Sequence, residues 1–172
     1  TTRIAVTEFK AMAGDGRVFL SWTAPETNLG YTYGIDVTAA GTSVKSLTAP
    51  QGTTSMLVND LTNGTEYVFA ITAVYAHGKS VTMTASATPG QISPISLSPE
   101  NPRPYELCKL EYNPAYFVMG TVASVEWSVN GTVISTSETA THLFTTPGTN
   151  TVTVKVTYDD GKSESGSVSV EV

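Results

Sequence analysis

Apolar and polar residues alternate over short stretches of this chain, and no stretch sustains the apolar spacing of a helix. A period of two is typical of β-strands with one buried face, whereas helices repeat about every 3.6 residues. Strands are predicted near residues 4–9, 18–22, 31–37, 44–47, 55–58, 66–75 and 81–87 of the first half, and near residues 92–97, 107–112, 122–129, 133–134, 141–144, 152–158 and 168–172 of the second half. The pattern therefore predicts an all-β protein.

Turn-forming residues separate these strands at short, regular intervals. Gly14-Asp15-Gly16 and Asp159-Asp160-Gly161 are two examples, and Asn130-Gly131 is a strong two-residue hairpin signal. A proline-rich stretch, residues 89–104, lies between the two halves. Each half has about the length of one small sandwich, ~100 residues or fewer. We therefore predict two tandem immunoglobulin-like β-sandwiches, at residues 1–89 and 90–172.

The stretch from Leu61 to Tyr67 is the most informative part of the first half. It places an apolar residue, a turn at Asn63-Gly64 and a tyrosine just before the alternating residues Val68 to Val74. In β-sandwiches a tyrosine at this point pins the corner between the two sheets through its hydroxyl. We expect this role for Tyr67, and we expect Trp22 in the first half and Trp127 in the second half to be core residues.

The first half resembles a fibronectin type III domain. Leu20-Ser21-Trp22-Thr23-Ala24-Pro25 is similar to the second strand of that family, and the stretch from Leu61 to Tyr67 is similar to its tyrosine corner. Ala73 to Ser80 resembles the end of strand F, the F–G loop and the start of strand G. The integrin-binding tripeptide Arg-Gly-Asp, found in the F–G loop of adhesive members, occurs nowhere in this chain.

The second half resembles a PKD-type immunoglobulin-like domain. Val125 to Gly131 corresponds to the Trp-Asp-Phe-Gly-Asp-Gly segment of that family, and Thr141 to Val154 resembles its His-x-Tyr…Pro-Gly-x-Tyr-x-Val stretch. Two departures stand out: Ser128-Val129 replaces acidic and glycine residues, and Asn150 stands where a tyrosine is usual. The corner of this half must therefore be held in another way.

Composition and charge exclude several classes of partner. The net charge is −6 with only 9 Lys and Arg residues, which does not favour binding to nucleic acid. No apolar run approaches the ~20 residues of a membrane-spanning helix. Cys108 is the single cysteine, so it cannot form an internal disulfide, and we expect it to be buried in a strand.

No arrangement of residues predicts catalysis or metal binding. The two histidines, His77 and His142, fall in different predicted domains. No set of His, Cys, Asp and Glu residues has the spacing of a zinc site. We therefore expect neither an enzyme nor a protein with a metal or cofactor. The glycosylation sequons at Asn63 and Asn130 coincide with turns that need Asn-Gly for their backbone shape.

Aromatic residues near predicted loops are the candidate ligand contacts. Tyr112, Tyr116 and Phe117 flank an Asn-Pro pair in the second half, while Tyr31 and His77 lie at loops of the first half. Exposed aromatic rings can stack on sugars or anchor a protein partner. The alternative is that these rings fill the cores, and the sequence leaves both possibilities open.

These observations favour a non-catalytic adhesion, recognition or spacer module of a secreted or cell-surface protein of bacterial origin, which a lipid anchor outside the chain could attach to a membrane. Its partner would be a protein or a glycan at the cell surface. One alternative is an accessory carbohydrate-binding module of a polysaccharide-utilisation system. Another is a phage or virion surface decoration protein, since immunoglobulin-like folds recur there.

Overall fold

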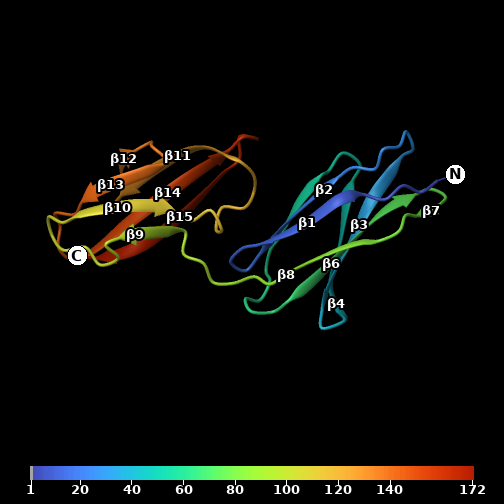
Figure 1. Ribbon diagram of the computed structural model, residues 1–172, viewed down its shortest axis with the longest axis horizontal. Helices are drawn as coiled ribbons and strands as arrows, with labels where there is room; N and C mark the ends of the chain where they lie inside the picture. Colours follow the sequence, from blue (N-terminus) through green and yellow to red (C-terminus); the bar gives the residue numbers. More distant parts are fainter. Residues whose placement is uncertain (1) are drawn as a thin grey trace. The chain divides into compact units, whose positions relative to one another are not determined.

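The computed structural model describes residues 2–172, which form strands and turns and contain no helix (Figure 1). The chain divides into two compact units, with the division between Gln91 and Ile92. Each unit is an antiparallel sandwich of two sheets. The prediction of an all-β chain with two tandem immunoglobulin-like sandwiches is confirmed.

The first unit contains eight strands in two sheets. They are β1 (Thr7–Ala13), β2 (Val18–Thr23), β3 (Tyr31–Ala39), β4 (Thr42–Pro50), β5 (Ser55–Val58), β6 (Tyr67–Tyr75), β7 (Gly78–Lys79) and β8 (Met83–Ala87). One sheet has the order β1-β2-β5, and the other has the order β4-β3-β6-β7 with β8 also paired to β6.

The core of the first unit is built by the inward-facing residues of the central strands. In β3 and β6 every second residue is buried, as the alternating sequence predicts. Trp22 is 5% exposed and contacts Tyr33 edge to face, with ring centroids 5.3 Å apart. The predicted core position of Trp22 is confirmed.

The tyrosine corner is present. The backbone N–H of Thr62 donates a hydrogen bond of 2.9 Å to Oη of Tyr67, the first residue of β6. Leu61, beside it, is buried and donates its own N–H to the carbonyl of Gly16. These two hydrogen bonds hold the chain where it passes from one sheet to the other. The prediction for Tyr67 is confirmed.

Three strands of the first unit differ from the sequence prediction. The opening strand, expected near residues 4–9, is β1 and extends from Thr7 to Ala13. The weak strand expected near residues 44–47 is the nine-residue β4, paired with β3 along most of its length. The last strand is divided into β7 and β8 around Ser80. The Ser80 hydroxyl accepts the N–H of Ala73 at 3.0 Å and so replaces a backbone partner, which a side-chain pattern cannot reveal.

The start of the proline-rich stretch belongs to the first unit. Pro89 is buried and its carbonyl accepts the N–H of Gly64 at 2.8 Å. The N–H of Gly90 donates to the carbonyl of Gly14 at 3.1 Å. These two bonds attach residues 89–90 to turns of the first sandwich.

The second unit contains seven strands. They are β9 (Ile95–Ser98), β10 (Leu107–Tyr112), β11 (Val122–Val129), β12 (Thr132–Ser135), β13 (Thr139–Leu143), β14 (Thr149–Tyr158) and β15 (Ser163–Glu171). The sheets have the orders β13-β10-β9 and β12-β11-β14-β15, and Trp127 is fully buried between them. The predicted core position of Trp127 is confirmed.

Asn150 holds the corner of the second unit. Its side chain is 2% exposed, and Nδ2 donates to the carbonyls of Thr146 at 2.9 Å and Gly148 at 3.1 Å. Its Oδ1 accepts from Nδ2 of Asn130 at 2.9 Å. A buried carboxamide thus satisfies backbone carbonyls at the bend, where a tyrosine would have bonded through its hydroxyl.

Candidate functional site

The aromatic residues expected to contact a ligand fall into two clusters, one in each unit. In the first unit Tyr31 begins β3 and faces Tyr75, the last residue of β6, as a direct cross-strand pair. Their ring centroids lie 5.5 Å apart, and the ring of His77 lies 5.6 Å from that of Tyr75. Tyr75 therefore connects the two predicted residues, and the sequence analysis had not singled it out.

Most of this first cluster is buried. Tyr31 is 8% exposed and Tyr75 is 5% exposed, whereas His77 lies on the surface. Burial raises the pKa of Tyr31 to about 12, and the neighbouring Tyr33 phenol adds to the shift. Burial also raises the pKa of Tyr75, whose hydroxyl donates to the carbonyl of Ile4 at 2.6 Å. The phenols are neutral packing groups, and His77 alone of the cluster is well placed to meet a partner.

The second cluster contains Tyr112, Tyr116 and Phe117. The Phe117 ring packs edge to face against both tyrosines, with centroids 5.9 Å from Tyr112 and 4.9 Å from Tyr116. Phe117 is 3% exposed and is therefore a core residue, which is the alternative that the sequence had left open beside a ligand contact. Both tyrosines are half-buried against the same core.

Tyr112 also lines a small hollow at the end of β10. The hollow has a volume of ≈ 250 Å³, and Ser124, Thr136 and Glu138 contribute polar groups to it. The Tyr112 hydroxyl donates to Oε1 of Glu138 over a long 3.5 Å. Burial raises the pKa of Tyr112, and the Glu138 carboxylate adds to this effect. A phenol, a carboxylate and two hydroxyl groups thus meet at one surface depression.

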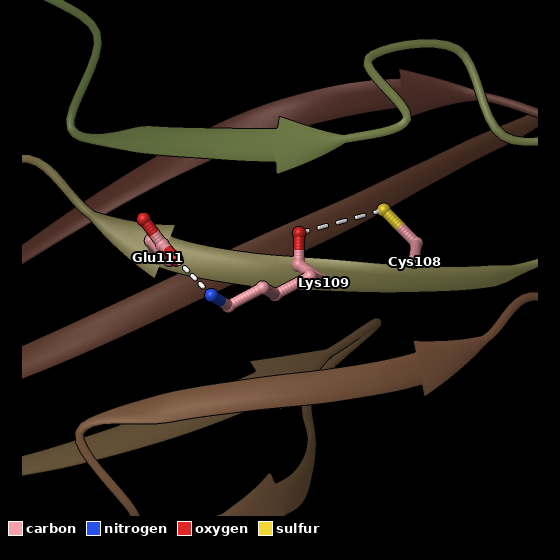
Figure 2. Close-up of polar contacts among 3 residues, drawn as sticks. All are labelled: Cys108, Lys109 and Glu111. Carbon is pink, nitrogen blue, oxygen red and sulfur yellow. Dashed lines mark hydrogen bonds and ion pairs between the residues drawn. The ribbon is translucent and has the colours of Figure 1, made fainter.

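Cys108 is not part of a reactive site. Figure 2 shows its thiol above β10, directed toward the carbonyl of Lys109, which lies 3.7 Å away. The thiol also donates to the carbonyl of Pro99 at 3.4 Å. The side chain is fully buried, and burial raises the pKa of the thiol. On the outer side of the strand the Lys109 ammonium pairs with the Glu111 carboxylate, both half-exposed, so this pair adds little stability (Figure 2). The expectation of a buried cysteine is confirmed.

A groove crosses the outer face of the β4-β3-β6-β7 sheet. We call it the Gly34 groove; its volume is ≈ 470 Å³ and its lining includes Gly34, Asp36, Ser46, Thr72, Val74 and Lys79. Gly34 sits in the middle of β3, and a Cβ built there would meet only Cγ2 of Val74, at 3.9 Å. The missing side chain therefore opens the floor of the groove.

The walls of the Gly34 groove carry several fixed polar groups among apolar side chains. Oδ1 of Asp36 accepts hydrogen bonds from the hydroxyls of Ser43 at 2.6 Å and Ser46 at 3.2 Å, which hold the carboxylate in place. The hydroxyls of Thr72 and Thr82 share a hydrogen bond of 2.9 Å on the opposite wall. A fixed carboxylate, hydroxyl groups and the Lys79 ammonium offer hydrogen bonds and charge to a partner, beside apolar side chains such as Leu47 and Val74.

Sequence reasoning missed Gly34, although a signal was present. The alternation Tyr31, Tyr33, Ile35, Val37 predicts that residue 34 faces solvent, and no turn there requires a glycine. Glycine inside a strand often marks a close approach by a ligand or another backbone. Tyr105, 71% exposed, was also missed; it directly follows the proline-rich stretch.

The titratable residues of the described chain do not gather into a metal site. Residues 2–172 contain no group of three or more His, Cys, Asp or Glu side chains able to hold a metal ion. His142 is half-buried, its ring packs edge to face on Phe144 at 4.7 Å, and burial lowers the pKa of its imidazole. Within the described part of the chain no helix is suited to spanning a membrane.

A sequence model of the fibronectin type III domain matches residues 5–91, which is more than half of the chain. The chain belongs to the fibronectin type III domain family. Fibronectin type III domains are typically non-catalytic structural or binding modules, and most are extracellular. Residues 92–172 lie outside the matched range, and the resemblance of this half to PKD-type domains stays a prediction.

Several solved structures are similar to the chain. The fn3 domain of the human collagen alpha-1(XX) chain is 23% identical, covers 54% of this chain and 90% of its own, and gives a TM-score of 0.48. A two-domain fibronectin type III segment from chicken tenascin is 17% identical over 98% of this chain and 99% of its own, with a TM-score of 0.47. Domains d3–d4 of the rat CD45 extracellular region are 20% identical over 51% of this chain and 50% of their own, with a TM-score of 0.45. No curated protein matches the chain.

Proposed function

We propose that the chain is a non-catalytic recognition and adhesion module of a secreted or cell-surface protein of bacterial origin. The fibronectin type III match over residues 5–91 supports this proposal, because domains of this family typically bind or space other proteins outside the cell. The two domains of the proposal are residues 1–89 and 90–172, and the second is a PKD-type domain.

The observation that carries the recognition role is the open floor of the Gly34 groove. Glycine in a strand interior is unfavourable, because it loses more conformational freedom on folding than other residues. At Gly34 no close internal contact requires the loss of the side chain. A partner that approaches the sheet closely supplies a reason for glycine at this position.

The chemistry of the groove suggests the partner. Asp36 and the hydroxyls of Ser46 and Thr72 can accept and donate hydrogen bonds, and Lys79 offers a positive charge. Backbone groups of a protein and hydroxyl groups of a glycan both fit such a surface. The partner in this proposal is therefore a polar protein or glycan surface at the cell exterior.

Filling the groove tests the proposal. Arginine in place of Gly34 would project into open space, so we expect Gly34→Arg to fold and to block the groove. Ser55→Arg is the matched control, because Ser55 is an exposed strand residue on the opposite sheet. The labelled chain and both variants would be applied to panels of immobilised extracellular-matrix proteins and polysaccharides.

We expect at least one panel member to retain the chain, with affinity about tenfold lower or worse for Gly34→Arg and unchanged for Ser55→Arg. Equal retention of wild type and Gly34→Arg would refute the groove as the binding site. Retention by no member of either panel would reject recognition and leave the spacer role.

A second candidate, glycan binding in the second unit, is favoured by the hollow beside Tyr112. An aromatic ring next to a carboxylate and hydroxyl groups is a suitable surface for a sugar. A glycan array would compare wild type with Glu138→Gln, which removes the charge, and with Tyr116→Ala, which removes the half-buried ring that packs on Phe117. The absence of a signal, or signals equal in all three proteins, would eliminate this candidate.

A further inference from the structure

One edge strand of the second unit differs from every other edge among residues 2–172. β15 pairs with β14 from Ser163 to Glu171 without a register shift, and its nine residues include no proline, lysine or arginine. The other edges are short or irregular: β5, β9 and β12 have four residues, β8 and β13 have five, β7 has two, and β1 and β4 carry register shifts. Proteins usually protect long edges with such features, because an open edge is a template for pairing.

The hydrogen-bonding groups of this edge alternate in direction. Val172 exchanges two backbone hydrogen bonds of 3.0 Å with Gly148, and Tyr158 N–H donates to the carbonyl of Lys162 at 2.8 Å. In an antiparallel ladder these hydrogen-bonded pairs determine which way the backbone N–H and C=O groups of every residue between them point. The even-numbered residues of β15 therefore bond to β14, and the odd-numbered residues present their N–H and C=O groups to the free edge.

A groove lies next to this edge. It has a volume of ≈ 550 Å³ and is lined by Ser93 and by residues of β9, of the turn after β9 and of β15. Leu97 of β9 and Val168 of β15 are half-buried there and supply apolar contacts (Figure 1 shows the two strands in the same unit). A strand added to β15 would direct every second side chain toward these two residues.

The charges of the groove indicate what kind of strand fits. Among the described residues that line it, Glu100 and Glu171 are acidic and none is basic. The whole chain is acidic as well, with a net charge of −6. Pairing with a second copy of β15 would bring further carboxylates to the edge, whereas a basic segment would neutralise them.

We propose that the free edge of β15 binds an extended, basic peptide segment of another protein. The segment adds as a strand to the backbone groups of Ser165, Ser167 and Ser169, places alternate apolar side chains against Leu97 and Val168, and sets a Lys or Arg beside Glu100 and Glu171. Strand addition of this kind takes its affinity from main-chain hydrogen bonds and its specificity from alternate side chains. This surface lies in the second unit and does not depend on the Gly34 groove.

The probe is a capped synthetic peptide, with as many residues as β15, that alternates valine and lysine. Amide hydrogen exchange followed by NMR would report the binding mode directly. We expect the peptide to slow exchange at Ser165, Ser167 and Ser169, because their N–H groups face the free edge. Exchange at Gly166 and Val168, which already donate to β14, should change little and serves as the internal control.

Two control peptides separate strand addition from simple charge attraction. The first carries N-methyl groups on alternate backbone amides, so it keeps the side chains and charges but cannot complete the ladder. The second alternates valine and glutamate. We expect neither to slow exchange at the odd-numbered residues. Equal protection by the N-methylated peptide would overturn the proposal.

Three protein variants complete the test. Ser169→Pro removes a free-edge N–H and leaves the bonds to β14 in place, so we expect the affinity for the valine–lysine peptide to fall about tenfold or more. Ser169→Ala keeps that N–H and should bind normally. Glu100→Lys reverses one exposed charge in the groove beside β15 and should also lower the affinity for the valine–lysine peptide. Unchanged peptide affinity in both Ser169→Pro and Glu100→Lys would overturn the proposal. Protection of the edge amides that rises with protein concentration in the absence of peptide would also overturn it, because a second copy of the chain would then occupy the edge.

Discussion

The side-chain amide of Asn130 donates a 2.9 Å hydrogen bond to the carboxamide oxygen of Asn150 and so joins the turn after β11 to the first residues of β14. The Asn130 oxygen in turn accepts the backbone N–H of Thr151 at 2.8 Å. Asn130 has a positive φ of 49°, a conformation that asparagine tolerates better than most residues. One pair of asparagines therefore supplies the turn geometry and the corner of the second unit.

Replacement of Asn150 should destabilise the second unit strongly. Asn150→Ala leaves the carbonyls of Thr146 and Gly148 without their donor and opens a space at a site that is 2% exposed. We expect a loss of about 2–4 kcal/mol in the free energy of unfolding, measured by urea denaturation. Asn101→Ala, an exposed asparagine of the same unit, should change stability by less than about 0.5 kcal/mol. Equal stabilities of the two variants would contradict the corner role.

The tyrosine corner of the first unit predicts a smaller effect. Tyr67→Phe removes the hydroxyl that accepts the N–H of Thr62 at 2.9 Å and keeps the buried ring. We expect the first unit to lose about 1–2 kcal/mol, since one backbone donor is left without its partner. Tyr105→Phe is the control, because Tyr105 is 71% exposed. A denaturation midpoint of Tyr67→Phe equal to wild type would show that water replaces the hydroxyl without cost.

The first unit should lose stability at alkaline pH. Burial raises the pKa of Tyr31 from 10.0 to about 12, so the folded state favours the neutral phenol more than the unfolded state does. This contribution is fully present below pH 10.0 and is lost as the pH rises toward about 12. Urea denaturation across this range should show a steeper decline for wild type than for Tyr31→Phe. Identical slopes would argue against the buried, neutral Tyr31.

Close packing at Gly166 predicts a steric effect in β15. A Cβ at this position would lie 3.3 Å from Cζ of Phe117 and only 2.3 Å from Cβ of Pro94. The distance to Pro94 is shorter than two carbon atoms can approach. We expect Gly166→Ala to destabilise the second unit by about 1–3 kcal/mol. Ser165→Ala, next to it and exposed, is the control.

The double variant Gly166→Ala/Pro94→Gly identifies the cause of this loss. Removal of the proline ring frees the space that the new methyl group needs, so the two substitutions should be less than additive. Strict additivity of the two free-energy changes would mean that Pro94 is not the obstacle.

The sequence predicted the parts of the fold that local patterns determine. Trp22 and Tyr67 stand in strands with clear alternation, and both occupy the places expected of them. The role of Asn150 at the corner of the second unit could not be predicted from the sequence, because its partner Asn130 lies 20 residues away along the chain. Alternation shows which face of a strand is buried but not which distant side chain completes a hydrogen bond.

The candidate contact residues show a second limit of sequence reasoning. Tyr31 and Phe117 lie next to loops, and the sequence left open whether their rings point into the core or outward; the structure buries both. The Gly34 groove and the β15 edge arise from what is missing, a side chain in one case and a neighbouring strand in the other. The pattern of apolar and polar residues does not predict where a side chain or a neighbouring strand is missing from the surface.

The buried state of Cys108 has a practical consequence. Its thiol is inaccessible and its raised pKa keeps the unreactive protonated form, so maleimide reagents should leave it unmodified in the native protein. A cysteine introduced at Ser55 on the first unit and another at Ser165 on the second would then be the reactive sites. A pair of fluorescent dyes attached there would report, by energy transfer, how freely the two sandwiches move about the segment that joins them.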